Sequence, residues 1–252
     1  MNNEQWRELS RRLRRRVIER AHAARCPHVG CAMSCLDIMA VLFEAHLRLT
    51  PWEQRDVFLL SKAHAHLALN SIRDYYPRGE SSGEALPAWD IEDRVEDAMH
   101  SLGHGLGMGQ GLAYGFKLQG SSRRVVVPMG DGETQKNSVW EAAQFAARLG
   151  MDNLTVIVDN NDLQGYGRPR KICGQKPSAE KWRAFGWQAV TVDGHDHQAV
   201  LAALQTPTQG KPLAVIAETV KGKGVSFMED QLHWHYYIVT DERRQRALEE
   251  LL

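Results

Sequence analysis

The residues best suited to chemistry are polar side chains that follow two apolar runs of the chain. Gly130–Glu133 reads Gly-Asp-Gly-Glu, and Asn161 follows about thirty residues after Asp131. Parallel α/β sheets bind ligands at the carboxyl ends of their strands, where the next helix offers free backbone N–H groups to an anion. The Asp131 carboxylate and the Asn161 amide are hard oxygen ligands of the kind that Mg²⁺ shares with phosphates. A lone Gly-Asp-Gly would be an ordinary turn, but this pairing predicts a site for Mg²⁺ and a diphosphate.

The elements that must position these residues alternate between strands and helices. Such alternation is typical of a doubly wound, mostly parallel sheet with helices on both faces, which is the α/β fold class. We expect residues 1–252 to form a single domain of this class. The expected strands are 56–60, 124–128, 154–158, 187–192 and 213–217, and the expected helices are 4–24, 34–47, one starting at 62, 135–149, 198–204 and a short charged helix near the C-terminus.

Two further segments have a distinctive composition. Residues 77–97 are rich in Pro, Gly, Ser and acids, which predicts an irregular surface loop. Residues 102–118 carry a glycine at every second position from Gly103 to Gly111. That composition predicts a close approach of the backbone to a ligand or to another helix.

The bulk composition excludes several classes of function. Lys plus Arg and Asp plus Glu both total 31, so the formal net charge is zero and does not favour nucleic acid or a membrane surface. No uninterrupted apolar run approaches about 18 residues, and the polar, Arg-rich N-terminus lacks the apolar core of a signal peptide. We therefore expect a cytoplasmic chain with no membrane-spanning helix.

The cysteines do not predict a metal site. Cys26, Cys31 and Cys35 are separated by gaps of four and three residues, whereas zinc sites usually show Cys-x-x-Cys pairs and a clear fourth ligand. Cys173 lies far away in the sequence. Reduced thiols are the expectation for a cytosolic chain.

The segment GDGETQKNSVWEAAQFAARLGMDNLTVIVDNNDLQGYG resembles the thiamine-diphosphate motif of the transketolase family. The resemblance covers nearly the whole chain in the family's order, through CPHVGCAMSCLDIMAVL, VFLLSKAHA, SLGHGLGMGQGLAYG and VKGKGVSFMEDQLHWH. It implies a metal bound by Asp131, Asn161 and the backbone carbonyl of Leu163. It also implies cofactor contacts at Leu102, Gly103, Gly130, Gly132 and Glu133, and histidines of a sugar channel at His28, His64, His104 and His235.

The resemblance further implies thiamine diphosphate and Mg²⁺ as cofactors, with Ca²⁺ or Mn²⁺ able to substitute. The implied reaction moves a two-carbon ketol unit from a sugar or sugar-phosphate donor to an aldehyde acceptor. In the family, the glutamate that activates the cofactor belongs to the next domain, which this sequence does not include. A separate C-terminal-type transketolase subunit is therefore expected as the partner, in a two-plus-two heterotetramer.

The sequence departs from the family pattern at three places. The usual Gly-His-Pro segment is absent, and His100 is the nearest candidate to replace its histidine. Lys136 stands where the family has a glutamate near the subunit interface, although the second acidic position is kept as Glu141. Ala63 replaces a usual glycine. The first two departures predict an unusual donor or acceptor.

Two other functions fit parts of the sequence. The cofactor-binding subunit of a split 2-oxoacid dehydrogenase or decarboxylase would also carry Gly-Asp-Gly and a following Asn-Asn, but SLGHG, SKAHA and KGKGVSFME favour transketolase. A non-catalytic scaffold or regulatory subunit would keep the fold without the site. The retained Asp131, Asn161 and His28 argue against a scaffold.

Overall fold

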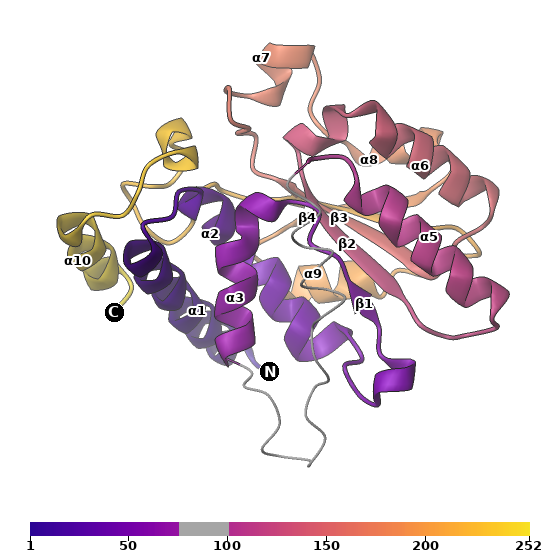
Figure 1. Ribbon diagram of the computed structural model, residues 1–252, viewed down its shortest axis with the longest axis horizontal. Coiled ribbons are helices and arrows are strands. Elements are labelled where there is room, and N and C mark those ends of the chain that lie inside the picture. The colour runs from indigo at the N-terminus through magenta and orange to yellow at the C-terminus, as the bar shows by residue number, and fades with distance from the viewer. Residues whose placement is uncertain (76–100) are drawn as a thin grey trace.

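The computed structural model describes residues 1–75 and 101–252 (Figure 1). The loop expected at 77–97 and the candidate His100 lie outside these residues.

Five parallel strands of the described chain form one sheet in the order β1-β2-β3-β5-β4. Their bounds are β1 Val57–Phe58, β2 Val125–Gly130, β3 Leu154–Asn160, β4 Gln188–Asp193 and β5 Leu213–Glu218. Successive side chains of a strand point to opposite faces of the sheet. Accordingly, Val126 packs in one hydrophobic cluster, whereas Val125 and Val127 pack in another. Both faces of the sheet are buried, as in doubly wound folds.

Helices cover both faces of this sheet (Figure 1). One layer contains α1, α2, α3 and α9, with α10 packed on α1, and the other contains α5, α6 and α8. Their bounds are α1 Asn3–Ala24, α2 Val29–Val41, α3 His66–Tyr75, α5 Gly105–Leu118, α6 Asn137–Arg148, α7 Pro169–Cys173, α8 Ala179–Ala184, α9 His197–Leu204 and α10 Asp241–Glu250. The predicted fold class is confirmed.

Helix α2 differs most from its prediction. It begins at Val29 rather than Ser34, and every residue from Val29 to Val41 is buried. A helix that is apolar all round lacks the periodicity that marks an amphipathic helix. Its first turn also has no side-chain cap, because His28 precedes it in a left-handed conformation at φ +70°. Ser34, the expected cap, lies inside the helix.

Smaller differences concern the ends of the elements. Strand β1 is shorter than 56–60, and β2 and β3 each run two residues further than predicted, to Gly130 and Asn160. Helix α6 starts at Asn137 because a 3₁₀ turn, Gly132–Gln135, precedes it. Helix α5 was not predicted, since only a close backbone approach was expected in the glycine-rich segment. The short helices α7 and α8 were not predicted either, since five and six residues give no clear period.

The segment Val29–His46 corrects the expectation that nothing in the chain is apolar enough to cross a membrane. This 18-residue helical window reaches a mean hydropathy of 1.4, although Asp37 and Glu44 interrupt the apolar run. Within the described fold, 83% of the window is buried. A core helix of a domain meets the same criterion, and the packing of α2 between α1, α3 and α9 agrees with that role.

The glycine-rich segment allows close packing against the sheet rather than against another helix. A Cβ added at Gly109 would lie 2.6 Å from Cγ2 of Val127, a residue of β2. Real Cβ atoms do not approach that closely, so α5 can seat on the sheet only with glycine there. A close approach therefore occurs, but its partner is β2 rather than the ligand or second helix that was predicted.

Candidate active site

A cavity of about 610 Å³ opens at the carboxyl ends of β2 and β3, where the sequence predicted a ligand site. Segments far apart in the chain meet there: the start of α2, the loop after β1, the turn after β2 and the 3₁₀ turn Leu232–His235. Most of the predicted site residues line it, namely His28, His64, Leu102, Gly130, Asp131, Gly132, Glu133, Asn161, Leu163 and His235.

The Asp131 carboxylate is the most unusual group in this cavity. Its side chain is 3% exposed, and Oδ1 accepts a hydrogen bond of 2.6 Å from the backbone N–H of Gly132. Oδ2 is buried and has no hydrogen-bond partner among residues 1–75 and 101–252. Burial, and then the nearby charge of Asp159, raise the pKa of Asp131 to about 6. A buried carboxylate with an unpaired oxygen is a group that a bound cation would satisfy.

The other two predicted metal ligands line the same cavity and already hold hydrogen bonds. Asn161 Oδ1 accepts from the backbone N–H of Leu163 at 3.0 Å. The Leu163 carbonyl accepts from the Lys221 ammonium at 2.9 Å. Each of these oxygens has a second lone pair, so each can still ligate a cation. Carboxylate, amide and carbonyl oxygens together form the donor set that Mg²⁺ prefers.

A buried charge network lies directly beneath these oxygens. Asp159, 1% exposed at the end of β3, accepts from the Lys62 ammonium, from Ser34 Oγ at 2.6 Å and from Thr219 Oγ1. Burial lowers the pKa of Lys62, but the Asp159 carboxylate outweighs burial and holds that pKa above its usual value. The network joins α2, the loop after β1 and the ends of β3 and β5, and it fixes the floor of the cavity.

Glu133 anchors the glycine-rich segment to the cavity wall. Its Oε1 accepts from Ser61 Oγ and, at 2.8 Å, from the backbone N–H of Gly103. Gly103 adopts φ +96°, where a side chain would be strained. Burial raises the pKa of Glu133, and these hydrogen bonds oppose the rise. The Glu133–Gly103 hydrogen bond thus holds the glycine-rich segment against the cavity wall, although Gly103 itself does not line the cavity.

Three of the four predicted histidines come together on one wall. Ring centroids lie 4.4 Å apart for His28 and His64, 4.8 Å for His28 and His235, and 5.0 Å for His64 and His235. His104 is exposed at the start of α5 and is not among the residues that line the cavity. The structure therefore does not bring His104 to the cluster, and its role stays a prediction.

We expect the rings of His64 and His235 to stay neutral at pH values well below the usual histidine pKa. Burial and then the Lys221 charge lower the pKa of His235 to about 3, and burial and then His28 lower the pKa of His64 to about 4. A depressed histidine pKa favours the neutral ring, so both rings should protonate only as the pH falls towards these values. NMR titration of histidine-labelled chain checks this. Midpoints near 6.5 for these two rings would contradict it.

Several residues at the cavity were missed by the sequence reasoning. Lys62, Cys31, Gln164 and Lys221 all line it. Lys136, which the sequence singled out only for a position near the subunit interface, also lines it and is exposed just before α6. Lys62 and Lys221 lie within the SKAHA and KGKGVSFME segments, so the resemblance included them, but it was used to assign roles only to histidines in such segments. Cys31 was considered solely with its neighbouring cysteines.

Comparison with known proteins shows similarity to transketolases. A family model described as "Transketolase, thiamine diphosphate binding domain" matches residues 110–245. The chain is 32% identical over 254 residues to an apulose-4-phosphate transketolase subunit of Actinobacillus succinogenes, covering 94% of this chain and 92% of that protein. It is 30% identical over 241 residues to "6-deoxy-6-sulfo-D-fructose transketolase subunit SqwG" of Clostridium sp. (strain MSTE9), covering 89% and 88%.

Longer relatives match over only part of their length. "Transketolase-like protein 2" of Bos taurus is 36% identical over 261 residues, and the chain covers 41% of it. Among solved structures, transketolase from Campylobacter jejuni superposes with a TM-score of 0.81 at 24% identity, covering all of this chain and 43% of the other. The chain thus spans about two fifths of these longer proteins, and the structural likeness supports the shared fold.

Proposed function

Because the chain belongs to the transketolase family, we propose that it is one subunit of a split, thiamine-diphosphate- and Mg²⁺-dependent transketolase. The assembled enzyme transfers a two-carbon ketol unit from a ketose or ketose-phosphate donor to an aldehyde acceptor. The observation that carries the proposal is the meeting of the Asp131 carboxylate, the Asn161 amide and the Leu163 carbonyl in one cavity. One buried oxygen of Asp131 has no hydrogen-bond partner in the described part of the chain.

The residues present fit the implied cofactor pair. Asp131, Asn161 and the carbonyl of Leu163 would hold Mg²⁺, and Ca²⁺ or Mn²⁺ could replace it, since all three ions take oxygen ligands. The Lys221 ammonium, buried beside Leu163, supplies positive charge that suits a diphosphate or an anionic sugar. When bound, thiamine diphosphate supplies an electron sink for breaking the carbon–carbon bond beside a ketose carbonyl.

The histidine wall supplies the proton chemistry. His28, His64 and His235 have lowered pKa values because they are buried, so their rings are neutral near pH 7. A neutral imidazole carries both a donor and an acceptor nitrogen, so it can hold a sugar hydroxyl or move a proton at it. We assign these three residues to that role.

The proposal includes a partner subunit, in a two-plus-two heterotetramer. Relatives named as transketolase subunits match this chain over about nine tenths of their length, whereas single-chain transketolases are more than twice as long as the matched part. In the neighbouring helices α5 and α6, Leu112, Leu118 and Phe145 are exposed at 39%, 70% and 51%. Exposed apolar groups on adjacent helices are consistent with a protein contact.

Lys136 bears on the identity of the sugar substrate. Lys136 lines the cavity and adds a positive charge where the family has a glutamate, so we propose a donor or acceptor other than the usual pentose phosphates. The relatives named above act, by their names, on apulose 4-phosphate and on 6-deoxy-6-sulfo-D-fructose. Because the matches are to transketolases, a 2-oxoacid dehydrogenase subunit is not favoured.

Reconstitution tests the function. The purified chain is mixed with a candidate C-terminal-type subunit, thiamine diphosphate and Mg²⁺, and two-carbon transfer from a panel of ketoses and ketose phosphates to aldehydes is followed by mass spectrometry. We expect transfer only when all four components are present. Turnover by this chain without a partner would rule out the split arrangement, and 2-oxoacid decarboxylation instead of ketol transfer would overturn the reaction class.

A further inference from the structure

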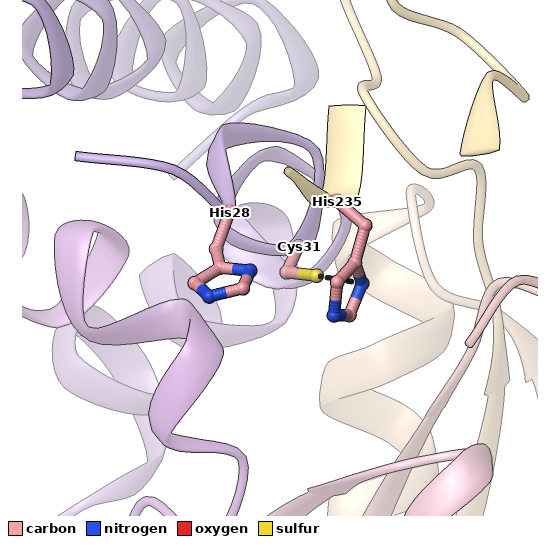
Figure 2. A group of neighbouring side chains, drawn as sticks. All are labelled: His28, Cys31 and His235. Carbon is pink, nitrogen blue, oxygen red and sulfur yellow. Dashed lines mark hydrogen bonds between the residues drawn. The ribbon is translucent and has the colours of Figure 1, made fainter. Parts of the chain in front are cut away.

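We propose that His28, Cys31 and His235 form a binding site for a thiophilic divalent cation such as Zn²⁺, distinct from the oxygen ligands assigned to Mg²⁺. One ligand atom from each of the three residues lies within 4.8 Å of the others. Figure 2 shows the Cys31 thiol between the two imidazole rings. Cys26 and Cys35, the neighbouring cysteines of the described chain, are not part of this group. The inference goes beyond the proposed function; the cation site stands on its own geometry, and only its effect on activity rests on the proposed function.

The geometry suits a zinc-type ion. Zinc binds imidazole nitrogen at about 2.0–2.1 Å and thiolate sulfur at about 2.3 Å in a tetrahedron, which places ligand atoms roughly 3.3–3.7 Å apart. Cys31 Sγ and His235 Nδ1 are already 3.5 Å apart. The wider separations, up to 4.8 Å, would close by about 1 Å through side-chain rotation. The fourth position would face the cavity.

The ligand atoms are available in the required form. His28 Nδ1 is buried, and no described residue hydrogen-bonds to it, which is costly for a polar atom unless something binds it. His28 and His235 are neutral because burial lowers the pKa of each, and neutral imidazole is the form that ligates metals. Cys31 is a free thiol, 5% exposed, and would release its proton to solvent on forming the metal–sulfur bond.

Lys221 competes with the cation and sets the limit on affinity. Its Nζ lies 3.3 Å from Cys31 Sγ, 3.1 Å from His235 Nδ1 and 2.9 Å from the Leu163 carbonyl. The ammonium can keep donating to Leu163 and to a metal-bound thiolate, since metal ligands commonly accept such outer hydrogen bonds. Of these three Lys221 contacts, the ion therefore has to replace only the one with His235. Removing the ammonium should strengthen cation binding.

A bound cation would occupy the histidine wall of the cavity. The cation would then hold both His28 and His235, which the proposed function assigns to the sugar. Occupancy would therefore block that role, so the site would make the enzyme sensitive to free zinc.

Cobalt titration tests the proposal. The full chain is stripped with chelator, desalted and titrated with Co²⁺ under excess Mg²⁺, which saturates hard oxygen sites. We expect a near-ultraviolet thiolate-to-Co²⁺ charge-transfer band that Zn²⁺ abolishes by displacement. Cys31→Ser should lose the band, whereas Cys35→Ser, a matched buried cysteine one helical turn away, should keep it. Lys221→Met should bind Co²⁺ more tightly.

Asp131→Asn separates this site from the predicted Mg²⁺ site, because it should keep the band while losing Mg²⁺-dependent cofactor binding. Absence of a charge-transfer band in the wild-type chain would overturn the proposal. An unchanged band in Cys31→Ser would overturn it as well. Circular dichroism of each variant establishes that it is folded before titration.

Discussion

Replacing Asp131 with asparagine is expected to lower turnover of the assembled enzyme by at least about 100-fold, while leaving the cofactor-free chain as stable as the wild type or more stable. The activity falls because the one charged metal ligand is lost. The stability is kept because the wild-type carboxylate is 3% exposed and lies near Asp159, so its charge opposes folding. A pKa raised from 3.8 to about 6 means that, at high pH, the ionised carboxylate lowers the free energy of unfolding by roughly 3 kcal/mol. A buried, unpaired amide donor offsets about 1–2 kcal/mol of that gain.

The stability difference should depend on pH in a defined direction. The raised pKa means that the Asp131 carboxyl group stabilises the folded chain fully below about 3.8 and progressively less as pH rises through about 6. The amide that replaces it in the variant does not titrate. The free energy of unfolding of the variant, relative to that of the wild type, should therefore rise by about 1 kcal/mol from pH 5 to pH 8.

Urea unfolding of the cofactor-free chain at the two pH values, with chelator present, measures this gap. Asp152→Asn, at a carboxylate whose side chain is 47% exposed, is the matched control for the loss of a carboxylate. A loss of stability in Asp131→Asn at pH 8, or turnover close to wild type, would contradict the role given to Asp131.

Replacing Lys62 with methionine is expected to destabilise the chain by about 3–5 kcal/mol. Lys62 is 5% exposed, and its ammonium donates to Asp159, which is 1% exposed, and to the Cys31 carbonyl at 3.2 Å. Methionine fills the space but leaves the Asp159 carboxylate buried without its lysine partner. Removing one member of a buried ion pair costs more than removing both. Lys62→Met/Asp159→Asn should therefore recover part of the loss.

Thermal and urea unfolding measure these effects. Lys211→Met, at an exposed lysine, is the control and should change the free energy of unfolding by less than about 0.5 kcal/mol. If Lys62→Met were as stable as this control, the Lys62–Asp159 pair would not hold the cavity floor. If the double variant were no more stable than Lys62→Met, the cost would not come from an unpaired Asp159.

The sheet and its ligand-binding edge could be predicted because they depend on local pattern. Short valine-rich runs bounded by polar residues mark buried parallel strands, and Asp131 and Asn161 stand directly after two of them. Neighbouring parallel strands place their carboxyl ends together, so these two residues were expected to meet. The ends of β2 and β3 were missed by two residues because pairing continues through Gly130 and Asn160.

Contacts between distant segments could not be predicted from spacing. His28, His64 and His235 meet only because α2, the loop after β1 and the turn after β5 converge, and the family resemblance alone suggested them. Lys221 lies 190 residues from Cys31 in the sequence yet contacts its sulfur. Considering cysteines only with one another hid the two histidines that flank Cys31.

The central claim is that Asp131, Asn161 and Leu163 hold Mg²⁺ and a diphosphate in an enzyme completed by a second chain. Calorimetric titration of thiamine diphosphate into the chain co-purified with its candidate partner, with and without Mg²⁺, tests it most directly. We predict tight binding that requires Mg²⁺ and the partner and is lost in Asp131→Asn. No binding under any of these conditions would contradict the claim and would favour a non-catalytic scaffold that keeps the fold alone.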